Sequence, residues 1–158
     1  MDTLAHGLLT YAIAGAKRTP RHWKWLVLFG ILPDLVWLPA TTYWLVTEGH
    51  VRFSIPLYDI SHSLVVWAAV TLCTMLYFRH AYAVTWPWAL HILIDIPGHN
   101  TAQVIFTPFL WPFSRFVIHG WWNWLSVPWL IVNYAVLTFV IAGILLRKRD
   151  RSNALQQK

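Results

Sequence analysis

Histidine and aspartate residues inside apolar stretches are the residues of this sequence best suited to chemistry. His91 and Asp95 are four residues apart in the stretch LHILIDIPGH. On a helix this spacing places both side chains on one face, within reach of one ion. A charged side chain in an apolar span is costly. The pair therefore indicates a metal site or, as the alternative, two hydrogen-bonded side chains in the core of a helical bundle.

Two further acids lie in or beside apolar stretches. Asp34 follows Pro33, which lacks a backbone N–H and tends to kink a helix, leaving polar backbone groups near the carboxylate. An acid at a broken membrane helix is typical of a functional site, and a local cap is the alternative. Asp59 either hydrogen-bonds His62 or caps the next helix, and the cap is slightly favoured. Whichever of Asp34 and Asp59 is not a ligand is a candidate general base.

Three more histidines lie near these acids. His62 stands between Ser61 and Ser63, so it belongs to a helix N-cap or is a ligand at the start of an apolar segment. His6 is a ligand or a lone structural histidine in the first apolar segment. His99 follows the fourth segment and is a ligand or a solvated loop residue.

The composition excludes an ordinary soluble domain. Of the 158 residues, 58% are hydrophobic and 11% are charged, whereas about 25% are charged in a typical soluble domain. The twelve Trp residues favour membrane interfaces. The net charge is +6, but the cations form short clusters beside apolar runs, so we expect membrane orientation and no nucleic-acid partner. Cys73 is the only cysteine, which excludes an internal disulfide and a thiolate metal cluster.

The fold class predicted from the apolar runs is all-α: an integral membrane bundle of about five segments, with no cleavable signal peptide. One domain covers residues 1–150, and a polar, frayed cytoplasmic tail covers 151–158. The aromatic stretch between the last two segments predicts an interfacial or re-entrant loop. The five segments are residues 3–16, 23–46, 62–79, 82–97 and 125–146, and the loop contains Phe106 to Pro112, Trp121, Trp122 and Trp124.

The cations set the orientation, because cytoplasmic loops are rich in Lys and Arg. They occupy alternate connections, which predicts an N-terminus outside and a C-terminus in the cytoplasm. These cations are Lys17, Arg18, Arg21 and Lys24, then Arg79, then Arg147, Lys148, Arg149 and Arg151. His22 and His80 then lie on the cytoplasmic side. All the candidate site residues reach the outer leaflet.

This shared leaflet favours a metal site open to the outer face. Imidazole and carboxylate ligands without sulfur suit Zn²⁺ best, with Mn²⁺, Fe²⁺ and Ni²⁺ as alternatives. The six candidate ligands exceed the four of one structural zinc ion, so either two ions bind or some residues act as a base or hold the ligands. The candidate ligands are His6, Asp34, His62, His91, Asp95 and His99.

Five short motifs in this order resemble the bacterial membrane-bound metal-dependent hydrolase family, which includes LexA-regulated inner-membrane hydrolases. They are MDTLAHGLL at the start, LPD at 32–34, SHSL at 61–64, HILIDIPGH at 91–99 and TPFLWPFS at 107–114. The resemblance covers residues 1–116 and implies an inner-membrane hydrolase whose ligands are His6, Asp34, His62, His91 and Asp95. The chain departs from the family at Leu57, Tyr58 and Asp59, where the family has His-Arg-Gly, which leaves open a shift of a ligand or base.

A looser likeness connects the same residues with zinc-dependent phospholipase C and related nucleases. Those proteins use His, Asp, His and His-x-x-x-Asp in this chain order, followed by further histidines, which here would be His99 and His119. Asn123 stands where their last Glu would be, so the likeness does not imply a full three-metal site. It implies phosphate esters as the substrate class.

The leading hypothesis is therefore a membrane hydrolase that uses one or two metal ions against a lipid or lipid-linked ester, with a phosphoester preferred. The alternative is a non-catalytic membrane protein with a structural metal site or a role in ion or proton transport. Transport would need polar residues that continue toward the cytoplasmic face, and the inner halves of the segments have few.

Overall fold

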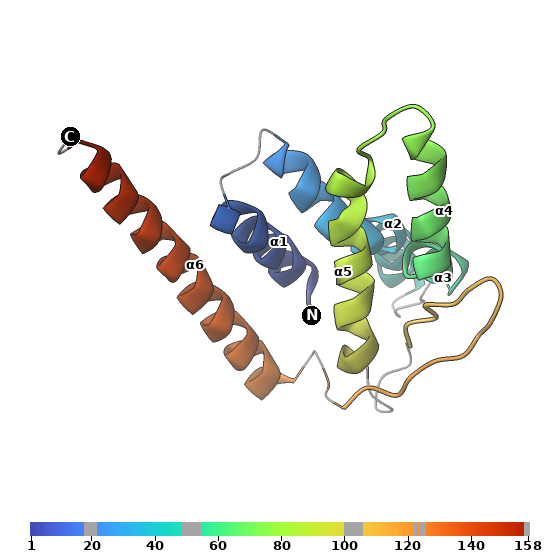
Figure 1. The fold of residues 1–158 in the computed structure, drawn as a ribbon. Coiled ribbons are helices and arrows are strands. Elements are labelled where there is room, and N and C mark those ends of the chain that lie inside the picture. Colours follow the sequence, from blue (N-terminus) through green and yellow to red (C-terminus); the bar gives the residue numbers. More distant parts are fainter. Residues whose placement is uncertain (18–21, 49–54, 100–105, 122, 124–125, 157–158) are drawn as a thin grey trace.

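The computed structural model describes residues 1–17, 22–48, 55–99, 106–121, 123 and 126–156. Helices dominate this part of the chain, and no β-strand occurs in it (Figure 1). The predicted all-α fold class is confirmed. The helices are α1 (Thr3–Lys17), α2 (Trp23–Glu48), α3 (Ile55–Ser61), α4 (Leu64–Met75), α5 (Tyr82–Gly98) and α6 (Val127–Gln156).

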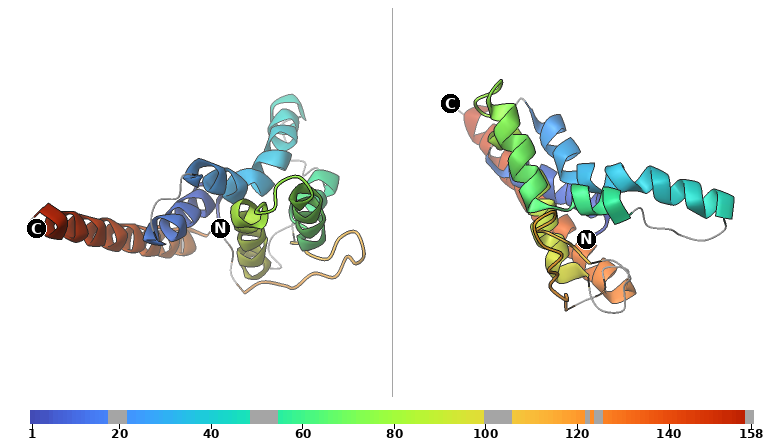
Figure 2. Two further views of the ribbon diagram at one scale, coloured as in Figure 1. Left: turned by 45° about the horizontal axis from the view of Figure 1, so that its top comes forward. Right: turned by 90° about the vertical axis from the view of Figure 1, so that its right-hand side faces the viewer.

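The helices α2 and α5 form the centre of the arrangement. α5 packs against α2 and α4, and α2 also packs against α1 and α3. Figure 1 shows α4 beside α5 and α6 at the edge, where it packs against α1. In Figure 2, α2 bends so that its second half extends away from α1 and α5. Pro33 and Pro39 lie inside α2, and each removes a helical hydrogen bond, which accounts for the bend.

The region around His62 differs from the prediction. A short helix, α3, precedes His62, with Pro56 in the first turn, where proline is tolerated. α4 begins at Leu64 instead of residue 62, because the Ser63 side chain accepts hydrogen bonds from the backbone N–H groups of Val65 and Val66. The helix cap expected from Asp59 is wrong, since Asp59 lies inside α3 and Ser63 caps α4.

The last helix is longer than predicted. α6 begins at Val127 and continues to Gln156, beyond the expected end at residue 146. The polar tail is therefore helical through Gln156 instead of frayed, while residues 157–158 lie outside the described residues. No Gly or Pro follows Gly143, and Arg, Lys, Leu and Gln are good helix formers.

Among the described residues, two helices are long and apolar enough to cross a membrane, namely Trp23–Glu48 and Val127–Arg147. At a rise of about 1.5 Å per residue, their 26 and 21 residues both reach the roughly 30 Å of a hydrocarbon core. The apolar helices Thr3–Ala14 and Leu64–Met75 are shorter. The membrane bundle of five segments therefore remains a prediction. Of the cations that predict its orientation, Arg18 and Arg21 lie outside the described residues.

The aromatic segment 106–121 contains turns and no helix. Its backbone ties the start of α4 to the end of α5. Leu64 N–H donates to the carbonyl of Phe109, and the N–H groups of Gly120 and Trp121 donate to the carbonyls of His99 and Pro97. The segment therefore closes one end of the bundle, beside His62 and His99. Trp122 and Trp124 lie outside the described residues.

Candidate metal centre

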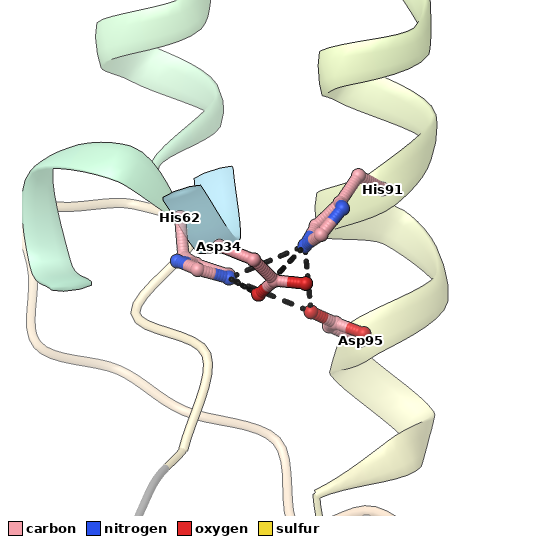
Figure 3. A group of neighbouring side chains, drawn as sticks. All are labelled: Asp34, His62, His91 and Asp95. Atoms are coloured by element: carbon pink, nitrogen blue, oxygen red, sulfur yellow. Dashed lines mark hydrogen bonds and ion pairs between the residues drawn. The ribbon is translucent and has the colours of Figure 1, made fainter. Parts of the chain in front are cut away.

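Four buried side chains from three parts of the chain meet at one point (Figure 3). Asp34 comes from α2, His62 from the turn between α3 and α4, and His91 and Asp95 from successive turns of α5. One ligand atom from each residue lies within 4.8 Å of the others. This group could hold a divalent metal ion.

The distances between these atoms fit a four-coordinate ion. His62 Nε2 is 3.3 Å from His91 Nε2, and Asp95 Oδ2 is 3.1 Å from His91 Nε2 and 3.5 Å from His62 Nε2. A tetrahedral zinc ion with ligands at about 2.0–2.1 Å separates its ligand atoms by roughly 3.3–3.4 Å. Asp34 Oδ1 lies 3.6 Å from His91 Nε2 and 3.7 Å from His62 Nε2. His62, His91 and Asp95 are thus a compact set, and Asp34 stands slightly further away.

The second nitrogen of each histidine ring fixes where its hydrogen lies. His91 Nδ1 is 2.8 Å from the carbonyl oxygen of Gly30, which can only accept. His62 Nδ1 lies 2.9 Å from Ser61 Oγ and 3.3 Å from the carbonyl oxygen of Tyr58. A hydrogen on His62 Nδ1 suits both of these oxygens when the Ser61 hydroxyl donates to the Tyr58 carbonyl.

In its neutral form, each ring then presents a lone pair at Nε2 toward the two carboxylates. With protons on both Nε2 atoms, two N–H groups would oppose each other across 3.3 Å. Two lone pairs and two carboxylates in a buried site need positive charge among them. A metal cation would supply it, as would a proton on one of the two Nε2 atoms, and the backbone carbonyls hold the rings in an orientation that suits ligation.

His6 lies directly behind this group. Its Nε2 is 3.0 Å from Asp95 Oδ1, the oxygen that does not face His91, and its ring stacks on that of His91 with centroids 3.7 Å apart. The terminal amine of Met1 also donates to Asp95 Oδ1, at 3.1 Å. The structure thus places His6 where it orients Asp95 and His91, outside the four residues whose ligand atoms meet.

His99 lies on the wall of a cavity of about 120 Å³ that Asp34, His62 and Asp95 also line. His99 Nδ1 is 2.9 Å from Thr107 Oγ1 and 3.4 Å from the Tyr58 hydroxyl. The ring of Tyr58 stacks on His62 with centroids 3.9 Å apart. His99 is buried, which excludes the solvated loop alternative, but it is not one of the four converging residues.

Asp59 is the candidate that the fold separates from the others. It lies on α3, half-buried, and does not belong to the four-residue group. Partial burial raises the pKa of its carboxyl group, and the charges of Arg115 and His62 oppose that change. His62 is held by Ser61 and Tyr58 instead of Asp59. Of the two candidate bases, Asp34 is therefore the one at the site.

Several residues support the site in ways that were not predicted from the sequence. Tyr58 stands four residues before His62, so helical spacing was a usable signal for their contact. Thr107 lies in an irregular segment, and the Gly30 carbonyl belongs to the backbone, so no side-chain pattern identifies either. Trp88 Nε1 donates to the carbonyl of Ser61 at 2.7 Å, which links α5 to the turn that carries His62.

Gly30 also marks a close approach between α1 and α2. A Cβ atom added at Gly30 would lie 2.4 Å from Thr10 Oγ1 and 3.1 Å from Thr10 Cβ. We expect Gly30→Ala to force the two helices apart and to lower the free energy of unfolding by about 1–3 kcal/mol. The shift would also move the carbonyl that holds His91, so metal affinity should fall about 10- to 100-fold. Thermal unfolding and metal titration measure the two effects.

Gly143→Ala is the matched control, because a Cβ at Gly143 meets no atom within 4 Å. In a helix this change should stabilise the protein by at most about 1 kcal/mol. If Gly30→Ala behaved like Gly143→Ala in both measurements, the close contact would be of no consequence.

No known protein family, curated protein or solved structure matches the chain.

Proposed function

We propose that this protein is a membrane-embedded, metal-dependent hydrolase that cleaves a lipid or lipid-linked ester, with a phosphoester as the preferred substrate class. The observation that carries the proposal is the convergence of two histidine Nε2 atoms and two carboxylates beside a cavity. The sequence motifs resemble those of membrane-bound metal-dependent hydrolases, and their order resembles zinc-dependent phospholipase C. Both likenesses support hydrolysis over other metal chemistry.

The residues divide into roles according to their positions. His62, His91 and Asp95 are the closest set and would hold the ion, for which Zn²⁺ is the preferred candidate and Mn²⁺, Fe²⁺ or Ni²⁺ the alternatives. When bound, the ion would lower the pKa of a water molecule to about 7 and polarise the ester oxygen. Asp34 stands further from both rings than Asp95 does, so in the proposed reaction it would take the proton of that water. His6 would orient Asp95 and His91, or contribute to a second ion.

A structural metal site is the second candidate function, because four protein ligands in a fully buried cluster are typical of structural zinc. The cavity beside Asp34 supports catalysis, since a catalytic ion keeps one position open. Ion or proton transport would need a polar path to the opposite end of the bundle. A large cavity at that end is lined mainly by apolar side chains, which favours a site reached from one side.

The membrane setting is part of the proposal. α2 and α6 would span an inner membrane, with α1, α4 and α5 beside them and the site at the outer leaflet. The cations near Lys24, Arg79 and Arg147 support a cytoplasmic C-terminus. The exposed rings of Phe113, Phe116 and Trp121 suit a loop at the outer interface. Labelling of Arg149→Cys from outside the cell, in a Cys73→Ala background, would overturn this orientation.

The full-length protein tests the proposal directly. Purified in detergent, it is expected to contain at least one equivalent of a divalent metal by elemental analysis. It should release a headgroup or phosphate from at least one member of a panel of phospholipids and lipid-linked diphosphates. A chelator should abolish this release, and added metal should restore it. A metal-free protein, or hydrolysis that the chelator leaves unchanged, is incompatible with the proposal.

A further inference from the structure

A second cavity, of about 1300 Å³, lies at the end of the bundle opposite the metal centre. It is formed by the end of α1, the start of α2, the end of α4 and the start of α5, together with the turn that joins α4 and α5. Figure 1 shows these helix ends on the far side of the bundle from the lower end of α5. The metal ligands lie later in α2 and α5 and before α4, so the two cavities occupy different halves of the molecule.

The walls of this groove are apolar and aromatic. They include Ile13, Leu26, Phe29, Val84 and Trp86. Trp25 and Phe78, also in the lining, are 57% and 70% exposed, so the groove opens toward the surroundings of the protein. Its volume exceeds the roughly 300–1,000 Å³ of ordinary small-molecule pockets. A ligand that fills this groove would be large and mostly hydrocarbon.

The rim of the groove carries basic side chains. His22, Arg79 and His80 line it and are exposed, and no acidic residue occurs among the described lining residues. All three belong to the turns at one end of the helices, where a headgroup would lie if the apolar walls lie in hydrocarbon. Arg79 matches a phosphate in charge and in hydrogen-bonding geometry.

We propose that this groove binds an anionic phospholipid, with acyl chains between the α1–α2 and α4–α5 pairs and the phosphate against Arg79, His22 and His80. This lipid is distinct from the substrate of the metal centre, because the groove lies at the other end of the helices. Its binding requires no catalysis. It would hold the α1–α2 and α4–α5 pairs together at the end of the bundle opposite the aromatic segment 106–121.

The test measures lipids retained by the full-length protein. Delipidated protein in detergent is mixed with phosphatidylglycerol or phosphatidylcholine of identical acyl chains, and bound lipid is counted by native mass spectrometry. Wild-type protein is expected to retain one phosphatidylglycerol in clear preference to phosphatidylcholine. Arg79→Gln should weaken phosphatidylglycerol binding about fivefold, the effect of one cationic side chain at an anionic headgroup. Glycerol phosphate should not compete, because it lacks the acyl chains.

Arg149→Gln is the matched control, since it removes the same charge from an exposed position on α6 that does not line the groove. Ala83→Trp tests the apolar part: it should fill the groove and lower retention of both lipids. Equal retention of the two lipids by wild type, or equal losses in Arg79→Gln and Arg149→Gln, would overturn the proposal. The two Arg variants decide the matter even if Ala83→Trp fails to fold.

Discussion

Asp95→Asn is expected to abolish metal binding and hydrolysis together. Oδ2 of Asp95 is within 3.5 Å of both histidine Nε2 atoms, while Oδ1 accepts from the Met1 amine and lies 3.0 Å from His6 Nε2. An amide keeps the shape of the side chain but replaces one acceptor oxygen by a donor and removes the negative charge. Loss of a partner behind a ligand costs up to about 100-fold in metal affinity, so loss of the ligand itself should cost more.

The measurements are metal content and lipid hydrolysis on the same preparation. Glu48→Gln is the matched control, because it makes the same chemical change at the exposed end of α2 and should leave both quantities as in wild type. His91→Ala should reproduce the double loss through the other partner of the pair. Neither change should prevent the proposed membrane insertion of α5, because Asp95→Asn removes a charge and His91→Ala removes a polar ring. If the Asp95→Asn protein keeps its metal, Asp95 is not a ligand of the ion.

The His91 and Asp95 pair was predictable because helical periodicity alone places residues four apart on one face. The prediction for Asp34 and His62 depends on topology instead. The order of the apolar segments and of the cation clusters places all the candidates at one end of the bundle. The group in Figure 3 contains all four of these candidates. Their approach to within 4.8 Å depends on how the helices pack, which no spacing in the sequence expresses.

The features in which the structure differs from the sequence prediction have physical causes as well. Helix α3 has seven residues, too few for an apolar period to appear, and without this helix the sequence favours a cap for Asp59. Gly30 contributes a carbonyl oxygen and the absence of a side chain, and both matter only because α1 and α5 approach it. The extra turns of α6 come from residues whose polarity suggested a free tail but whose helix propensity is high.

Asp34→Asn separates the catalytic and the structural functions of the metal. Asp34 Oδ1 is further from the two Nε2 atoms than Asp95 Oδ2 is, and Asp34 lines the cavity in which a substrate group would lie. If His62, His91 and Asp95 hold the ion, Asp34→Asn should retain metal. It should lose about 10²- to 10⁴-fold in hydrolysis, the range for removal of a general base.

Thermal unfolding of the same variant completes the comparison. Binding of a structural ion contributes directly to folding free energy, so a protein that loses such an ion unfolds at a lower temperature. For a catalytic Asp34 we expect a Tm close to that of wild type, unchanged metal content and lost hydrolysis. Loss of metal and a lowered Tm in Asp34→Asn, together with a wild type that hydrolyses no lipid in a broad panel, would instead establish Asp34 as the fourth ligand of a structural site. The difference follows from one carboxylate: as a ligand it stabilises the ion and the fold, whereas as a base it acts only when substrate occupies the cavity.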